Sequence, residues 1–187
     1  ALRYSTKTIE PVWSYLANSS VSGSFDIPMS RNYTRLSSIF ASFAKEPAAD
    51  GSGKEKLCNS FFVHLGSVET LSYSLQLGTK RIPDNDSVGF GEAWWRLLNC
   101  IGISGSLAHS TGITYADYST SSFCLGVSCE KIPHLASTGD NLSNTSTIFL
   151  RIKGWGTTAA DLPSRCLLIP ELDQCIEIRD TTVELFT

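Results

Sequence analysis

Over most of the chain, hydrophobic positions alternate with polar positions at a period of two. The clearest case is 70–78, where apolar residues are separated by Ser72, Ser74 and Gln76. This alternation predicts a strand with one buried face and one polar face. Turn-forming Gly, Pro, Asn and Asp lie between the segments of this kind. Further strands are predicted at 36–43, 61–65, 122–129, 147–153, 166–169, 174–178 and 183–186.

One segment has a helical pattern instead. Trp94 and Leu97 lie at helical spacing, Glu92 falls in the first turn, and Gly102 follows closely enough to end a helix. We predict one short helix at about residues 91–100. Such a helix typically closes one end of a β-sandwich, and we expect its paired tryptophans to pack there.

Many short strands separated by turns, with one helix, indicate an all-β protein: a sandwich, a barrel or a jelly roll. The 187 residues, 42% of them hydrophobic, are enough for one buried core. The loops predicted at 45–56 and 154–164 do not separate two halves of domain size. We therefore expect a single domain over residues 1–187, with 1–19 as an extended lead-in.

Composition excludes several classes of function. The chain has 15 basic and 18 acidic residues, a net charge of −3, and only 18% charged residues. No basic cluster is present to neutralise phosphates, so we expect no direct binding to nucleic acid. No apolar run is long enough to cross a bilayer, and the first residues lack the apolar core of a signal peptide. Polarity comes instead from 27 serines and 16 threonines.

The sequence shows no catalytic, metal-binding or cofactor-binding motif. His64, His109 and His134 are scattered, without the spacing of a metal site, and no nucleophile-elbow motif is present. The carboxylates are dispersed as well, with Glu130 and Glu171 fitting ordinary charges at strand edges. We therefore expect no enzyme activity and no cofactor. A pair of carboxylates from distant strands, as glycosidases use, is kept as an alternative.

Six cysteines occur, several of them inside apolar runs where a free thiol packs as a small hydrophobic group. We favour reduced cysteines. Cys166 and Cys175, on either side of Pro170, are the one pair placed for a local disulfide. Five glycosylation sequons begin at Asn18, Asn32, Asn85, Asn141 and Asn144, as expected by chance in a chain so rich in Ser and Thr.

Two tryptophans outside the predicted helix are candidates for exposed rings. Trp13 lies near the start of the chain, and Trp155 lies between two glycines. Exposed aromatic rings serve as anchors at protein interfaces and as platforms for sugars. Packing in the core or in a subunit contact is the interpretation we favour for both.

The order of several short motifs carries more information than any one of them. Leu75-Gln76-Leu77-Gly78-Thr79-Lys80-Arg81-Ile82-Pro83 precedes the predicted helix, and Phe123-Cys124-Leu125-Gly126-Val127-Ser128-Cys129-Glu130-Lys131 follows it. Thr138-Gly139-Asp140-Asn141 comes next, and Ile176-Glu177-Ile178-Arg179-Asp180 closes the chain. This succession, over residues 20 to 186, resembles the C-terminal jelly roll of double jelly-roll major capsid proteins of the virophage and Polinton-like virus type.

The resemblance implies a jelly-roll sandwich of two antiparallel sheets. It implies a structural subunit that forms trimeric, pseudo-hexagonal capsomers of an icosahedral shell, in a virion assembled inside the host cell. It also implies that this chain belongs to a longer double jelly-roll protein, with other copies of itself and minor capsid proteins as partners. The alternative is a secreted carbohydrate-binding or glycoside-active β-sandwich, which the sequons, the even number of cysteines and the aromatic residues suggest.

Overall fold

The computed structural model describes residues 2–16, 23–29, 31, 33–44, 70–106, 108–120, 122–131, 139, 141–142, 148–155, 163–179 and 182–186. The strands in these ranges are β1 (Leu2–Ile9), β2 (Val12–Tyr15), β3 (Phe25–Met29), β4 (Leu36–Ala44), β5 (Ser72–Leu77), β6 (Lys80–Val88), β7 (Cys124–Ser128), β8 (Ile148–Lys153), β9 (Arg165–Arg179) and β10 (Thr182–Phe186). The helices are α2 (Gly89–Ile101) and α3 (Tyr115–Thr120). The strand expected at 61–65 lies outside the described residues, as do most of the two predicted loops.

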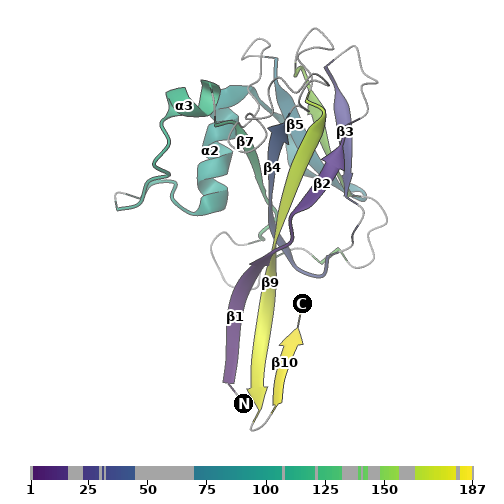
Figure 1. The fold of residues 1–187 in the computed structure, drawn as a ribbon, viewed down its shortest axis with the longest axis vertical. Helices are drawn as coiled ribbons and strands as arrows, with labels where there is room; N and C mark the ends of the chain where they lie inside the picture. Colours follow the sequence, from purple (N-terminus) through teal and green to yellow (C-terminus); the bar gives the residue numbers. More distant parts are fainter. Residues whose placement is uncertain are drawn as a thin grey trace, which may run out of the picture.

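The strands form two antiparallel sheets packed face to face (Figure 1). Sheet A has the order β1–β9–β4–β7, with β2 and β10 also paired to β9, and sheet B has the order β3–β8–β5–β6. In both sheets, strands from the beginning and the end of the chain are neighbours. This nesting is the double Greek key of a jelly roll. The expected all-β jelly-roll sandwich is therefore confirmed.

Strand β9 differs from the prediction. The sequence suggested two short strands separated at Pro170, but β9 runs from Arg165 to Arg179 without a break. Pro170 lacks an N–H, and a proline is tolerated only where the ladder needs no donor. Its carbonyl faces the β1 and β2 side, where it accepts from Glu10 N at 3.2 Å. The N–H that Pro170 lacks would therefore point into the gap between β1 and β2, where no strand pairing depends on it.

Beside β9, strands β1 and β2 share one position in the sheet. Strand β2 pairs with residues 165–168 of β9, and β1 pairs with residues 171–178. The described part of the expected lead-in thus contributes two strands. Residues 171–179 of β9, together with β1 and β10, extend beyond the body of the sandwich as a three-stranded projection (Figure 1), which we call the ribbon.

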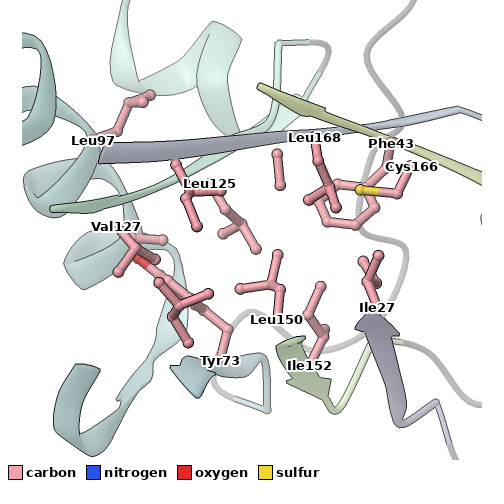
Figure 2. Packing of buried hydrophobic residues seen from close by; sticks show 14 of the residues in the cluster. Ile27, Phe43, Tyr73, Leu97, Leu125, Val127, Leu150, Ile152, Cys166 and Leu168 are labelled. Carbon is pink, nitrogen blue, oxygen red and sulfur yellow. The ribbon is translucent and has the colours of Figure 1, made fainter. Parts of the chain in front are cut away.

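The core lies between the inner faces of the two sheets. Figure 2 shows side chains of β4, β7 and β9 facing those of β3, β5 and β8. The labelled core residues of the two sheets are Phe43, Leu125, Val127, Cys166 and Leu168 in sheet A, and Ile27, Tyr73, Leu150 and Ile152 in sheet B. Inward positions alternate with outward ones along each strand, as the period of two predicts.

An aromatic cluster closes one end of the sandwich. The ring of Trp155, just after β8, lies 4.5 Å from that of Phe43 and 5.7 Å from that of Phe123, measured between ring centroids. Phe123 lies 5.1 Å from Phe90, at the start of α2. Tyr118 of α3 is also completely buried and lies against both Phe90 and Phe123.

Helix α2 confirms the prediction at 91–100, but its tryptophans do not close the sandwich. The ring of Trp94 contacts Tyr118 of the aromatic cluster, with 4.8 Å between the ring centroids, and Trp95 is 56% exposed. The helix lies instead on the outer face of β7. There Gly126 provides the space, because a Cβ at this position would lie 3.1 Å from Leu97 Cα. The paired tryptophans were thus the wrong candidates, because α2 turns only one of them inward.

Candidate assembly surfaces

Among the described residues, exposed large hydrophobic side chains gather in three areas. The first is the ribbon, with Leu2, Tyr4, Ile9, Ile178 and Val183. The second is strand β2, with Trp13 and Tyr15. The third comprises the end of β6, α2, α3 and the connection between the two helices, with Val88, Trp95, Ile101, Ile113 and Tyr115. Apolar patches of this kind mark contact sites when they are contiguous.

On β2, two aromatic rings stand on the outer face of sheet A. Trp13 is 53% exposed and Tyr15 is 72% exposed. Being two residues apart, they share a face, opposite Leu167 and Arg165 of β9. The guanidinium of Arg165 lies 5.6 Å from the centre of the Tyr15 ring. These four residues, which we call the β2 surface, form an apolar patch. It carries one charge, the guanidinium of Arg165, which stacks on the ring of Tyr15.

Trp155, the other candidate for an exposed ring, is completely buried in the aromatic cluster. Its backbone N donates to Gly23 O at 2.9 Å, which holds the residue at the end of the sandwich. Trp155 therefore packs in the core, which is the interpretation that the sequence favoured, and it is not an exposed ring. The flanking glycines suggested a loop, but the tight backbone there directs the ring inward.

Beside α2 lies a groove of about 270 Å³. Its lining residues are Ile82, Trp95, Arg96, Asn99, Gly126, Val127 and Ser128. Arg96 is held by Glu92 of the same helix, with Nε donating to Oε1 at 2.8 Å. The other Glu92 oxygen accepts from Val88 N at 2.9 Å and so caps the start of the helix. The groove wall is therefore fixed, and Trp95 lies at its edge.

A cluster of charges attaches β1 to the rest of sheet A. Lys7 Nζ lies 3.1 Å from Glu130 Oε1 and 3.3 Å from Glu171 Oε2. Ser37 Oγ donates to the same Glu130 oxygen at 2.9 Å, and Ser38 donates to Glu171. Burial opposes the charge of Lys7, but the hydrogen bond to Glu130 and the charges of both carboxylates outweigh it, and the pKa of Lys7 is raised.

The sequence alone presented Glu130 and Glu171 as unrelated charges at strand edges. The structure brings them together on Lys7, although they lie on different segments of the chain. The one ammonium group of Lys7 contacts both carboxylates, and each carboxylate also accepts a hydrogen bond from a serine. This pairing favours a structural role over the acid and base roles of a glycosidase pair.

The candidate disulfide between Cys166 and Cys175 is wrong. Both residues lie on β9, nine positions apart, so their Cα atoms are separated by roughly 30 Å. A disulfide needs Cα atoms within about 7 Å. Neither thiol forms a disulfide, and Cys100, Cys124 and Cys129 form none either. The sixth cysteine, Cys58, lies outside the described residues.

Burial also makes several of these thiols unreactive. It raises the pKa of Cys100 and of Cys124 to about 12, and it raises the pKa of Cys166 further. A thiolate is the nucleophilic form of cysteine. These three positions are therefore unsuited to covalent catalysis at neutral pH.

We expect alkylation to distinguish these thiols from one another. In the native protein at pH 8, iodoacetamide should modify Cys175, which is partly exposed, well before Cys166, which is completely buried, and before Cys124, because burial raises the pKa of Cys124 to about 12. In denaturant, all three should react at similar rates. Peptide mass spectrometry at a series of times measures this order. Equal native rates, or a Cys166–Cys175 bridge, would contradict the structure.

Within the described ranges, no group of three His, Cys, Asp or Glu side chains is placed to hold a metal ion. His64 and His134 lie outside those ranges. Of the sequons, those at Asn85 and Asn141 are described, and both asparagines are exposed. No helix in the described part of the chain has the length and apolar character to cross a membrane.

Comparison with solved structures relates this geometry to viral shells. The PBCV-1 virus capsid matches all of this chain at a TM-score of 0.58 and 11% identity. PBCV-1 VP54, fitted into a reconstruction of the virophage Sputnik, also matches all of it, at 0.57 and 13% identity. The Sputnik virophage structure matches 98% of the chain, at 0.52 and 6% identity. In fold, the chain resembles the double jelly-roll major capsid proteins.

The match extends over this whole chain but only part of the others. It covers 52% and 51% of the two PBCV-1 capsid chains and 38% of the Sputnik chain. The chain thus spans about half the length of the first of these structures. No protein-family model matches the sequence, and no curated protein matches it.

Proposed function

We propose that this chain is a structural subunit of an icosahedral viral capsid, which forms trimeric, pseudo-hexagonal capsomers. The observation that carries the proposal is the agreement in fold, over the full chain, with three capsid structures. Its role is mechanical and not enzymatic. It resides in the virion after assembly inside the host cell, and it makes no direct contact with nucleic acid.

The positions of two exposed surfaces support assembly into a ring. The β2 surface lies at the β1 and β2 side of sheet A, and the α2 groove lies at β7 on the opposite side. A ring requires two different surfaces that meet head to tail. We assign the contact within a capsomer to the β2 surface of one subunit and the α2 groove of the next. Trp13 is the aromatic anchor of this contact.

The expected longer chain completes this arrangement. A second jelly roll, preceding residues 1–187, would place six jelly rolls in each trimer and so generate the pseudo-hexagonal outline. The extent of the match, about half of the PBCV-1 capsid chains, supports this part of the proposal. Minor capsid proteins would then bind between capsomers.

A carbohydrate-binding role is the second candidate, because Trp13 and Tyr15 form an exposed aromatic pair on a sheet face. Arg165 already covers part of the Tyr15 ring, which leaves a smaller platform for a sugar. A glycan array distinguishes the two functions. Specific binding that is lost in Trp13→Ala would favour the carbohydrate role.

The capsid proposal is tested by the mass of the particles that the purified protein forms. Light scattering coupled to size exclusion should show trimers, and electron microscopy of the full-length product should show hexagonal capsomers or shells. A protein that stays strictly monomeric at high concentration, in its full-length form, would contradict the proposal.

Replacing the anchor should weaken the trimer specifically. We expect Trp13→Ser to weaken trimer association by about tenfold or more, because a buried interfacial tryptophan typically contributes at least that much. Sedimentation equilibrium measures the change. The control is Val183→Ser, which removes another exposed apolar side chain, 69% exposed, on the ribbon and outside both contact surfaces. Equal association of the wild type and Trp13→Ser would remove Trp13 from the contact.

A further inference from the structure

Strand β1 buries little of its own surface in the fold. Among the described strands, it pairs with β9 alone. Its apolar side chains Leu2, Tyr4 and Ile9 are 61%, 52% and 62% exposed, so they gain little from burial. The attachment of β1 therefore depends on its polar contacts more than the attachment of the core strands does.

Lys7 connects β1 to segments beyond β9. Its ammonium group lies 3.1 Å from Glu130 Oε1, just after β7, and 3.3 Å from Glu171 Oε2 on β9. The same two oxygens accept hydrogen bonds from β4, Glu130 Oε1 from Ser37 and Glu171 Oε2 from Ser38. We call these five residues the Lys7 cluster. Each carboxylate thus uses one oxygen to bind both β1 and β4.

The two carboxylates of the Lys7 cluster are less exposed than the ammonium group between them. The side chain of Glu130 is 7% exposed and that of Glu171 is 22% exposed, against 44% for Lys7. A negative charge in such a place is unfavourable without a cation, and docking of β1 brings the cation. A protonated carboxyl group has no such need. Proton uptake by the carboxylates and docking of β1 therefore compete with each other.

Other ionisable groups face the Lys7 cluster from the neighbouring elements. Asp173 is opposite Lys7 in the register of β1 and β9, and it accepts from Gly139 N at 3.0 Å. Cys100 of α2 stays a thiol, because burial and the charge of Glu130 raise its pKa to about 12. Of the groups around the cluster, only the carboxylates change charge between about pH 7 and pH 4. The remaining charged residues on these elements are Lys80, Arg81 and Asp84 on β6, which line a cavity of about 330 Å³ with Glu130, together with Arg96 on α2, Arg35 before β4 and Lys131 after β7.

We propose that the Lys7 cluster is an acid-sensitive latch, which holds β1 on sheet A at neutral pH and releases it when Glu130 and Glu171 take up protons. The jelly-roll core is held by apolar packing between the two sheets and stays folded while β1 opens. Release is thus a local opening of one strand, distinct from unfolding of the sandwich.

The charge of Lys7 does not change in the acid range. Burial opposes this charge, but the hydrogen bond to Glu130 and the charges of both carboxylates outweigh burial, and the pKa of Lys7 is raised. A raised pKa means that the contribution of Lys7 is complete below its usual value of 10.5 and is lost only in alkaline solution. The release in acid therefore belongs to the carboxylates.

The other ion pair of β1 lacks this property. Arg3 Nη2 lies 3.3 Å from Glu177 Oε2, but Glu177 Oε1 also accepts a hydrogen bond from Arg179 Nε at 2.8 Å. The hydrogen bond from Arg179 lowers the pKa of Glu177. Since Arg179 lies on β9 beside it, Glu177 keeps a cation when β1 leaves. Arg3 therefore serves as the control position on the same strand.

Hydrogen exchange of the native full chain tests the latch, with rates corrected for the intrinsic effect of pH. Between pH 7 and about pH 4.5, near the ordinary pKa of a glutamate, we expect amides of β1 to lose protection by at least about tenfold. Amides of β4 and β5 should keep their protection. Unchanged protection of β1 over this range would overturn the proposal. Loss of protection in β1, β4 and β5 together would overturn it as well, because that is unfolding of the whole sandwich.

Two variants show which groups operate the latch. The double variant Glu130→Gln with Glu171→Gln mimics the protonated state, so β1 should be open at pH 7 and its protection should no longer depend on pH. Lys7→Gln removes the cation, so β1 should open at pH 7 and acid should open it no further. Protection of β4 and β5 shows that each variant is folded. A folded double variant in which β1 keeps its wild-type protection at pH 7 would contradict the proposal.

Two controls make the outcome specific. Arg3→Gln removes the other ion pair of β1 and should leave the pH dependence of its exchange unchanged. Asp26→Asn replaces a carboxylate on sheet B, where Arg151 Nε donates to Asp26 Oδ1 at 3.0 Å, and should behave as the wild type does. Loss of the pH dependence in Arg3→Gln would assign the titration to Glu177 and overturn the latch. The test is independent of the trimer, because the Lys7 cluster lies outside the β2 surface and the α2 groove.

Discussion

Trp155→Ala should reduce the free energy of unfolding by about 3 to 5 kcal/mol, the cost of removing a large buried aromatic side chain. The ring is completely buried and contacts Phe25, Phe43 and Phe123 at centroid distances between 4.5 and 5.8 Å. Alanine would leave a cavity where both sheets and the segment leading into β7 meet. Urea denaturation followed by circular dichroism measures the loss.

The matched control is Trp95→Ala. It makes the same chemical change at a tryptophan that is 56% exposed, and we expect a loss of about 1 kcal/mol or less. A similar loss for both variants would mean that the aromatic cluster does not hold the sandwich closed. It would also reopen the idea that Trp155 serves as a contact residue.

Gly154→Ala should destabilise the fold by about 3 kcal/mol or more, through two effects that add. Gly154 has a φ of 70°, in the left-handed region, where an L side chain costs about 1 to 2 kcal/mol. A Cβ at this position would also overlap the carbonyl group of Thr70. Relieving that overlap requires a backbone shift between the end of β8 and the start of β5, at a further cost of about 1 to 3 kcal/mol.

Gly105→Ala separates the two effects. Gly105 has a φ of 78°, but a Cβ there would meet no atom within 4 Å. We expect a loss of only about 1 to 2 kcal/mol, from backbone conformation alone. Thermal or urea unfolding of both variants gives the difference. If the two substitutions cost the same, the close approach of Thr70 to Gly154 would be absent in solution.

Much of the fold could be predicted from local pattern. Alternation in 70–78 and 147–153 located β5 and β8, and helical spacing located α2, because in each case the buried side chains repeat at the period of the element. Helix α3 was not predicted, although a signal was present. Thr114 and Asp117 cap its start reciprocally, with Asp117 N donating to Thr114 Oγ1 at 3.2 Å.

Other features could not be predicted because their cause lies in distant segments. Pro170 looks like a strand break in the sequence, and only the gap between β1 and β2 explains why β9 passes through it. The first strands were missed since β1 is mostly exposed and shows no buried periodicity. Its strand pairing is with β9, more than 150 positions away in the sequence.

The candidate surfaces likewise depend on contacts between distant segments, which the sequence did not reveal. Trp13 and Trp155 were equivalent candidates in the sequence, yet one is exposed on β2 and the other is buried. Glu130 and Glu171 were unrelated until the sheet placed both beside Lys7. The three-stranded ribbon required the register of β1, β9 and β10, which no local pattern contains.

The amino-acid sequence by itself determined the all-β class, the helix at 91–100 and the low charge of the surface, because these depend on residue type and on short-range periodicity. Tertiary structure alone decided which aromatic rings are exposed, which carboxylates are paired and which strands form the ribbon. The physical reason is that burial and pairing are properties of strands brought together from opposite ends of the chain. In the described sheets, six of the eight strand pairs join strands that are not consecutive in the chain.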